Sequence, residues 1–311
     1  MRRSIEPVRT RTPRATLTVG VVGAGRVGAT LGAALTAAGH RVVAASGTSD
    51  ATAERIGQML PDTAHLPPTQ VARAATDLLL VSVPDDALAA VVRGLADDGA
   101  LRPGQVVAHT SGAHGLAPLD PAVARGARPL ALHPAMTFTG RPEDVARLRG
   151  ISYGVTARAD VHPFAARLVG QLGGAIEWIR DSDRGLYHAA LAHGANHLVT
   201  LVNDALDRLR DAGVRHPEQM LAPLLRASLE NTLAFGDAAL TGPVSRGDAG
   251  TVARHLAELT EVAPDSVATY RALARRTADR AISAGRLRPV DAEPLLDVLA
   301  DAREGTPHDD L

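Results

Sequence analysis

Three histidines and an asparagine lie together in a short stretch rich in alanine and glycine, residues 185–197, "GLYHAALAHGANH". On a helix, His188, Ala192 and Asn196 fall within about 80° of arc at about 100° per residue. Imidazole and carboxamide groups can orient a carbonyl or imine group, and an imidazole can protonate it. Gly194 leaves room for close approach to the backbone, at a cost of about 1 kcal/mol relative to alanine. We interpret His188 and Asn196 as catalytic; the alternative is helix packing with incidental polar groups.

A glycine-rich motif near the start of the chain predicts a turn that binds phosphate. Gly23, Gly25 and Gly28 form G-x-G-x-x-G between a predicted strand and a predicted helix, the context that this motif requires. Gly23 allows a tight turn, Gly25 lets the backbone approach a pyrophosphate, and Gly28 lets helix and strand pack closely. The helix N-terminus adds free N–H groups and a partial positive charge. We assign Arg26 and Val27 to the same cofactor site; the alternative is a turn that binds nothing.

The end of the second predicted strand favours NADP(H) over NAD(H). An NAD site places Asp or Glu there to hold the ribose 2′-hydroxyl, whereas this chain has Ser46. A 2′-phosphate would meet the hydroxyls of Ser46 and Thr48 before the first carboxylate, Asp50, and Arg26 would add positive charge. No arginine follows the strand directly, as in many NADP sites, so NAD(H) stays an alternative.

Polar residues also stand at the ends of three later predicted strands. Ligands of an open parallel sheet bind beyond the carboxyl ends of its strands, so these residues would gather around a nicotinamide and a substrate. For each histidine among them, the alternative is a satisfied side chain that only caps a strand. The assignments are Val83, Pro84 and Thr110 for the cofactor, Ser111 for catalysis, and His109, Gly112 and His133 for the substrate.

The elements that must position these residues form two predicted domains. Continuous apolar strands alternate with helices over residues 16–182 and predict an α/β domain, a Rossmann doubly wound parallel sheet. Helical patterns over 183–303 predict an all-α domain, and we expect a disordered arm at 1–15 and a disordered tail at 304–311. A predicted core-facing stripe on the first long helix comprises Leu191, Ala195, Leu198, Val202, Ala205 and Leu209.

The composition of the 311 residues excludes several kinds of function. A net charge of −1 gives no bulk attraction to nucleic acid or anionic membranes, and no apolar run reaches the roughly 18 residues of a membrane span. The chain has no cysteine, which excludes thiolate chemistry and fits a cytoplasmic protein. It also has no lysine, so no lysine serves as acid, base or Schiff base. No metal is expected, because the weak His193/His197 pair has no carboxylate partner.

The order of these parts resembles the 6-phosphogluconate dehydrogenase-like superfamily. That superfamily includes ketopantoate reductases, β-hydroxyacid dehydrogenases, prephenate dehydrogenases and pyrroline-carboxylate reductases. Within it, residues 16–285 look like a branch that joins a Rossmann-like domain to a helical domain of unknown function. The similarity rests on "HTSGAHG" at 109–115, "LHPAMTF" at 132–138, "LYHAALAHGANHLVTL" at 186–201 and "LTGPVSRGD" at 240–248.

The absent lysine is a departure from this superfamily. Ketopantoate reductases and β-hydroxyacid dehydrogenases carry a catalytic lysine on the first long helix of the helical domain, followed by two asparagines. Setting Asn196 on the second asparagine puts His188 at the lysine position. The resemblance then implies that His188 donates the proton, that Asn196 orients the substrate oxygen and that Arg246 clamps a carboxylate. Asp248 is equally a helix cap or a site residue.

These expectations combine into an NADPH-dependent reductase of a small carboxylated ketone or imine, with ketopantoate as the first substrate to test. One alternative is an oxidative dehydrogenase similar to the prephenate dehydrogenases, whose strand-end histidine resembles that of "ALHP" at 131–134. Another is a non-catalytic NADP-binding protein. The resemblance also implies a homodimer formed through the helical domain.

Overall fold

The chain divides into two compact units, Met1–Gly194 and Ala195–Leu311. The computed structural model describes residues 16–300 of them; the predicted arm at 1–15 and the predicted tail at 304–311 lie outside this range. The domain boundary that the sequence predicts after residue 182 stays a prediction.

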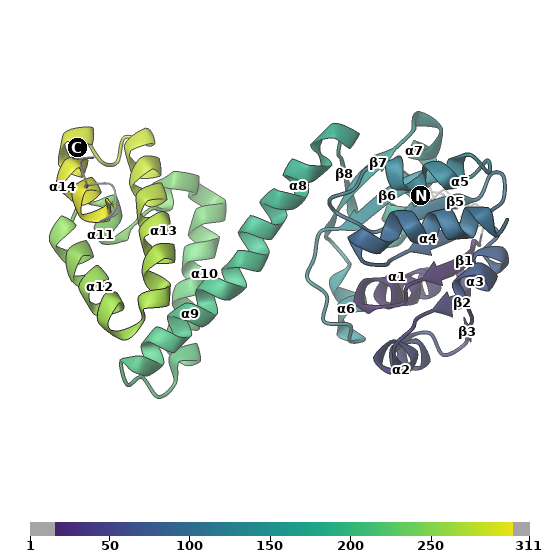
Figure 1. Cartoon of the computed structure of the whole chain (residues 1–311), viewed down its shortest axis with the longest axis horizontal. Helices are drawn as coiled ribbons and strands as arrows, with labels where there is room; N and C mark the ends of the chain where they lie inside the picture. Colours follow the sequence, from purple (N-terminus) through teal and green to yellow (C-terminus); the bar gives the residue numbers. More distant parts are fainter. Residues whose placement is uncertain (1–15, 301–311) are drawn as a thin grey trace, which may run out of the picture. The chain divides into compact units, whose positions relative to one another are not determined.

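The first unit is built on one sheet of eight strands in the order β3-β2-β1-β4-β5-β6-β7-β8 (Figure 1). The first six strands are parallel and follow the Rossmann order 3-2-1-4-5-6, whose switch point lies between β1 and β4. This order confirms the predicted α/β fold. The strands are β1 (Thr18–Val22), β2 (Arg41–Ser46), β3 (Ala64–His65), β4 (Leu78–Val81), β5 (Val106–His109), β6 (Arg128–Pro134), β7 (Ser152–Ala157) and β8 (Ala175–Trp178).

Strand β7 departs from the predicted all-parallel sheet. It pairs antiparallel with β6 and places Gly154 opposite His133, while β8 runs parallel to β7. The chain between β6 and β7 contains only the short helix α6 (Glu143–Arg147) and returns along β6 instead of crossing over the sheet. A pattern of apolar residues predicts a strand but not its direction, so this difference could not be seen in the sequence.

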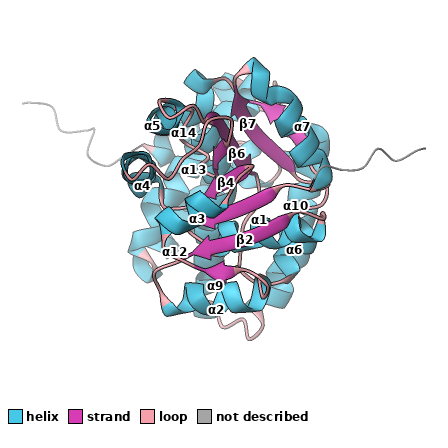
Figure 2. Ribbon diagram, turned by 90° about the vertical axis from the view of Figure 1, so that its right-hand side faces the viewer, coloured by secondary structure: helices cyan, strands magenta, loops and turns pink. Residues whose placement is uncertain are grey.

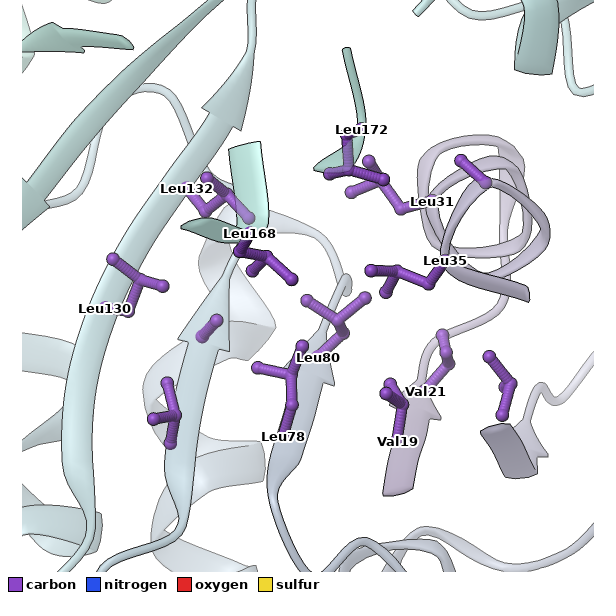
Figure 3. Packing of buried hydrophobic residues seen from close by; sticks show 14 of the residues in the cluster. Val19, Val21, Leu31, Leu35, Leu78, Leu80, Leu130, Leu132, Leu168 and Leu172 are labelled. Atoms are coloured by element: carbon purple, nitrogen blue, oxygen red, sulfur yellow. The ribbon is translucent and has the colours of Figure 1, made fainter. Parts of the chain in front are cut away.

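Helices cover both faces of the sheet, because alternate residues of each strand point to opposite sides. Leu78 and Leu80 of β4 pack with Leu35 and Leu168 on one face (Figure 3), and Leu79 packs in the core of the other. Figure 2 shows β2, β4, β6 and β7 as members of this sheet. The first face holds α1 (Arg26–Ala37), α2 (Asp50–Met59), α6 and α7 (His162–Gln171), and the second holds α3 (Pro68–Ala74), α4 (Asp85–Asp97) and α5 (Asp120–Val123).

Side chains cap the N-termini of two helices that bear on the site. Ser49 caps α2 by accepting a hydrogen bond from the Thr52 N–H at 3.3 Å. Asp248, expected to be a helix cap or a site residue, caps its helix by accepting from the Thr251 N–H at 3.0 Å. Pro84 is the cap residue of α4, and Asp85 and Asp86 lie in the first turn, where they interact favourably with the positive end of the helix dipole.

The second unit is helical throughout the part that the structure describes. Its core lies between three helices and includes Val252, Ala278 and Leu295. No helix within residues 16–300 is long and apolar enough to cross a membrane. The helices are α9 (His197–Asp211), α10 (Pro217–Phe235), α11 (Gly242–Ser245), α12 (Ala249–Val262), α13 (Pro264–Ser283) and α14 (Pro289–Leu299).

The predicted core-facing stripe is not buried, because helices α9 and α10 are largely exposed. Helix α9 has no buried residue, and α10 buries only Pro217. Leu198 of the stripe is 41% exposed, and Leu233 of α10 is 79% exposed. The spacing of Leu191, Ala195, Leu198, Val202, Ala205 and Leu209 therefore marks a helical stretch, but not a face that this chain buries by itself.

Candidate functional site

The glycine-rich turn joins β1 to α1 with close contacts that only glycine permits. Gly23 has a φ of 84°, in the left-handed region that favours glycine. A Cβ on Gly23 would lie 2.5 Å from the carbonyl oxygen of Ser82, and a Cβ on Gly28 would overlap the carbonyl oxygen of Gly23. These two glycines therefore let β1, β4 and α1 pack closely, as predicted for a dinucleotide-binding turn.

Gly25 differs from its neighbours because open space lies beside it. A Cβ on Gly25 would have no atom within 4 Å, although its φ of −67° would suit any residue. It is the N-cap of α1, no side chain caps the first turn, and that turn holds no acidic residue. The free end of a helix favours anions, so the turn fits a pyrophosphate that lies where a side chain would otherwise stand.

Ser46 supports this turn from the end of β2. Its Oγ accepts a hydrogen bond from the Gly23 N–H at 3.3 Å, and its carbonyl oxygen accepts from the Ala24 N–H at 2.7 Å. The side chain is buried. The structure thus gives Ser46 a supporting role that the prediction of phosphate contact did not include, while Thr48 is exposed in the loop before α2.

Two arginines meet at Gly140, beside the glycine-rich turn. A Cβ on Gly140 would lie 2.9 Å from Arg26 Cγ and 2.8 Å from Arg55 Nε, and Arg55 Nε donates to the Gly140 carbonyl at 3.4 Å. Asp144 holds this loop by accepting hydrogen bonds from the N–H groups of Thr139 and Gly140. The sequence did not single out Arg55, because it stands on α2 and not directly after β2.

The ends of β4 and β5 lie against the glycine-rich turn. Thr110 Oγ1 donates to Ser82 Oγ at 3.0 Å, and Val83 Cγ1 is 2.9 Å from the position of a Cβ on Gly23. Pro84 follows as the cap residue of α4. The residues assigned to the cofactor from β1, β4 and β5 are therefore brought together.

His109, which we expected to contact the substrate, forms hydrogen bonds to the backbone with both ring nitrogens. Its Nδ1 accepts a hydrogen bond from the Ser111 N–H at 3.2 Å, and its Nε2 donates to the Gly115 carbonyl at 2.7 Å. The side chain is fully buried, and burial lowers the pKa of His109 to about 4. Because both ring nitrogens have backbone partners, no ring nitrogen is left for a substrate.

Two other predicted histidines meet at Gly112. A Cβ on Gly112 would lie 2.5 Å from His188 Cδ2 and 3.1 Å from His133 Nε2. The two rings are edge to face, with centroids 6.0 Å apart. Ser111 precedes this glycine, is buried, and accepts from the His114 N–H at 3.1 Å. Gly112, His133 and His188 thus form one cluster, which we call the histidine cluster.

Tyr187 and Arg184 belong to the same neighbourhood and were missed. Tyr187 Oη lies 2.8 Å from His133 Nδ1, and a Cβ on Gly154 would overlap the Tyr187 phenol. The Arg184 side chain is 1% exposed and its Nη1 donates to the Gly154 carbonyl at 3.2 Å. The available signal was helical spacing, since both residues lie within the last turn before His188 on α8 (Arg184–Leu191).

Electrostatics keep His133 uncharged. Burial lowers the pKa of His133 to about 4, and the charges of Arg184 and His188 act in the same direction. Nε and Nη2 of Arg184 are buried without a hydrogen-bond partner among the described residues. A buried cation of this kind favours an anionic ligand nearby.

Asn196 and Arg246 lie in the second unit, and both are exposed. A π-helical turn, Ala192–Asn196, separates α8 from α9. Such turns are closed by i→i+5 hydrogen bonds, so they rotate the chain less per residue than an α-helix. The value of about 100° per residue used above therefore holds for α8 but not for this turn, and the roles of Asn196 and Arg246 stay predictions. Within residues 16–300, no group of three or more His, Asp or Glu is arranged to hold a metal.

Comparison with protein families finds two matches in the order expected from the sequence. A model described as a Rossmann-like domain matches residues 5–134, and a model described as a domain of unknown function, DUF2520, matches residues 151–277. No curated protein sequence matches the chain.

Solved structures of similar fold cover most of the chain. One is a Bacteroides fragilis protein for which NADP oxidoreductase activity has been proposed, with a TM-score of 0.72 and 21% identity over 85% of this chain and 98% of that one. Protein TM1727 from Thermotoga maritima has a TM-score of 0.65 and 18% identity over 86% and 100%. An imine reductase from Myxococcus stipitatus in complex with NADP+ has a TM-score of 0.58 and 16% identity over 90% and 98%. At these identities the likeness shows a shared fold.

Acid should destabilise the protein through His109 and His133. The pKa of each is about 4 in the folded protein against an ordinary 6.5, so the unfolded chain takes up protons first as the pH falls. The free energy of unfolding therefore decreases between about pH 6.5 and about pH 4. The free energy of unfolding should differ between pH 7 and pH 5, and we expect His109→Asn to reduce that difference by about 2 kcal/mol. Urea unfolding at both pH values measures it. An equal pH dependence in the variant and the wild type would contradict this assignment.

Proposed function

The chain belongs to the proteins that combine a Rossmann-like domain with DUF2520, and from that premise we propose that it is an NAD(P)-dependent oxidoreductase acting on a small ketone or imine. The observation that carries the proposal is the open space beside Gly25 at the N-terminus of α1. The histidine cluster supports it, because β1, β4 and β6 end at the same edge of the sheet. The NADP+ complex of the Myxococcus imine reductase, which has the same fold, is consistent with it.

The cofactor would lie across the carboxyl ends of the strands. Gly25 and the first N–H groups of α1 would hold the pyrophosphate, and Val83 and Thr110 would line the path toward the histidine cluster. A bound nicotinamide supplies or accepts the hydride. All other groups of the reaction come from the chain itself.

We further propose that NADP(H) is preferred over NAD(H). Arg26 and Arg55 meet at Gly140 next to the glycine-rich turn. They would provide the positive charge that an arginine directly after β2 provides in many NADP sites. No carboxylate occupies the end of β2, where Ser46 is buried in support of the turn. Two guanidinium groups that meet beside the glycine-rich turn suit a 2′-phosphate.

His188 is our proposed proton donor for a reduced oxygen or nitrogen. It contacts the Gly112 position and is partly exposed, whereas His133 is uncharged at neutral pH and cannot deliver a proton as an imidazolium. Ser111 and Asn196 remain candidates to hold the reacting atom. The buried charge of Arg184 favours a substrate with a carboxylate, for which Arg246 remains a second candidate, and ketopantoate is the first compound to test.

Oxidation is the second candidate direction. The uncharged ring of His133 at the end of β6 could accept a proton from a hydroxyl group. Turnover with NADPH and a 2-oxo acid or cyclic imine would support reduction, whereas reduction of NADP+ by a hydroxy acid would support oxidation. Tight binding of NADPH without turnover across both panels would identify a non-catalytic binding protein.

A Gly25→Asp variant should separate cofactor binding from folding. Aspartate is a good N-cap residue, so we expect the free energy of unfolding to change by less than about 0.5 kcal/mol. Its carboxylate would occupy the pyrophosphate space, so we expect the affinity for NADPH to fall about 100-fold. Fluorescence titration with NADPH and NADH measures the affinity, and the wild type should bind NADPH more tightly.

Gly57→Asp is the matched control for that variant. Gly57 is exposed on α2, and a Cβ there would have no atom within 4 Å, so it adds the same charge to open space away from the turn. Equal NADPH affinity of Gly25→Asp and Gly57→Asp would remove the glycine-rich turn from cofactor binding.

His188→Ala should lower turnover about 100-fold once a substrate is identified, because a general acid contributes at least that much. The affinity for NADPH should stay within a factor of about two, since the imidazole is not part of the proposed cofactor site. Steady-state kinetics and cofactor titration measure the two quantities separately. Full turnover in the variant would assign proton donation to another group.

We also propose a homodimer formed through α9 and α10. Helix α9 has no buried residue, and α10 exposes Leu224, Leu229 and Leu233. An open apolar cavity of about 750 Å³ lies alongside, with Leu209 and Leu273 in its lining. Apolar faces of this extent mark interaction sites, and the resemblance to dimeric relatives makes a second copy of the chain the expected partner.

Leu233→Glu should weaken this dimer about 30-fold or more, because it buries a charge in an apolar interface. Leu186→Glu is the control, since Leu186 is as exposed as Leu233, 78% against 79%, but lies on α8. Light scattering after size exclusion should show a wild-type dimer, a dimer for the control and a monomer for Leu233→Glu. A monomeric wild type would contradict the proposal.

A further inference from the structure

The ring of Tyr187 fills a space that Gly154 leaves open on the sheet. Gly154 of β7 lies directly opposite His133 of β6 in the antiparallel pair. A Cβ on Gly154 would overlap the phenol oxygen of Tyr187, so only glycine leaves room for this ring. The phenol oxygen thereby lies 2.8 Å from His133 Nδ1, and the two rings are edge to face with centroids 5.6 Å apart.

The hydrogen bonds around the phenol indicate which atom carries the proton. Burial raises the pKa of the Tyr187 hydroxyl, so this group carries a proton that it can donate to His133 Nδ1, 2.8 Å away. A neutral imidazole that accepts at Nδ1 carries its own proton on Nε2. His133 Nε2 lies 3.1 Å from the position of a Cβ on Gly112, on the side of the ring that faces the histidine cluster.

We propose that Tyr187 is a positioning residue that holds His133 in a single tautomer, with an uncharged Nε2–H directed at the reacting oxygen or nitrogen beside Gly112. The inference rests on the proposed function for the identity of that atom. His133 would then stabilise developing negative charge as a hydrogen-bond donor, while His188 supplies the proton. Burying a neutral imidazole costs less free energy than burying an imidazolium. A neutral Nε2–H also stabilises negative charge without giving up its proton, so its role stays separate from that of the proton donor.

The charged groups that face His133 support an uncharged ring. Arg184 lies beneath the pair, with its guanidinium carbon 5.8 Å from the centre of the Tyr187 ring. His188 and His109 add to the effect of Arg184, Asp85 opposes it, and burial is the largest cause of the low pKa of His133. Arg184 also opposes the effect of burial on the pKa of Tyr187, which remains raised.

The tautomer can be measured without a cofactor or a substrate. Long-range proton–nitrogen correlation spectra of the full-length ¹⁵N-labelled protein distinguish the two neutral forms of histidine, and His133→Gln identifies the signals. We expect His133 to show the Nε2–H form, without titration, from pH 6 to pH 8. An Nδ1–H form, or a charged ring in this range, would overturn the proposal.

Tyr187→Phe tests the cause. It removes one oxygen atom and keeps the ring, so we expect His133 to lose its single tautomer, seen as a shift of both ring nitrogen signals. Tyr270→Phe is the matched control, because Tyr270 Oη and His255 Nδ1 are also 2.8 Å apart, in an edge-to-face pair on α12 and α13. That variant should leave the His133 signals unchanged. An unchanged His133 spectrum in Tyr187→Phe would overturn the positioning role.

Kinetics provide the functional readout. With any substrate that the wild type turns over, Tyr187→Phe should lower kcat about tenfold, a part of the loss expected for removing a donor to the reacting atom, and leave NADPH affinity unchanged. Unchanged kcat with an altered tautomer would overturn the link to the reaction. Absence of NADPH binding by the wild type would instead count against the proposed function, and the tautomer measurement would stand by itself.

Discussion

The site depends on places where the chain has no side chain. Gly23 and Gly28 allow β1, β4 and α1 to approach within distances that any Cβ would prevent, and Gly25 leaves open space at the end of the helix. Gly112 and Gly154 do the same for β5, β7 and α8, because the rings of His188 and Tyr187 lie where their side chains would be. Close packing elsewhere in the sheet makes these positions rigid. The missing side chains of these glycines therefore determine where there is room for a dinucleotide and where the imidazole rings lie.

Burial of charge is the second constraint, and it works against stability. The guanidinium of Arg184 is buried with two nitrogens that lack partners among the described residues, and two histidines are buried in uncharged form. Isolated buried charges destabilise folded proteins unless they are paired. Such an arrangement is retained where it serves binding or chemistry, and here burial lowers the pKa of His133 while the same cation that costs stability acts in the same direction. His109 shows the contrasting case, because its two backbone hydrogen bonds account fully for its burial.

Part of this architecture could be predicted from the sequence because it follows from local chemistry. Apolar runs over residues 16–182 predicted the α/β sheet, and the motif around Gly25 located the tight turn between β1 and α1. The convergence of Gly112 and His133 followed from the rule that strand ends meet at one edge of a parallel sheet. The direction of β7 could not be predicted, because a residue pattern carries no information about direction. Arg55 and Arg184 were missed because their roles come from a distant loop at Gly140 and from burial of a residue type that is usually exposed. The stripe on α9 was interpreted as core because helical spacing alone does not distinguish a face that the chain buries from one that it leaves exposed.

The histidine cluster differs in its chemistry from the lysine that this chain lacks. A lysine ammonium keeps its proton at neutral pH unless it is strongly desolvated, and it is a flexible point charge. The two histidines of the cluster differ in their surroundings, because burial lowers the pKa of His133 to about 4 whereas His188 is partly exposed. Both imidazole rings pack against Gly112, and the Tyr187 ring that contacts His133 packs against Gly154. The two glycines therefore determine where these three rings can lie in a chain that has no lysine.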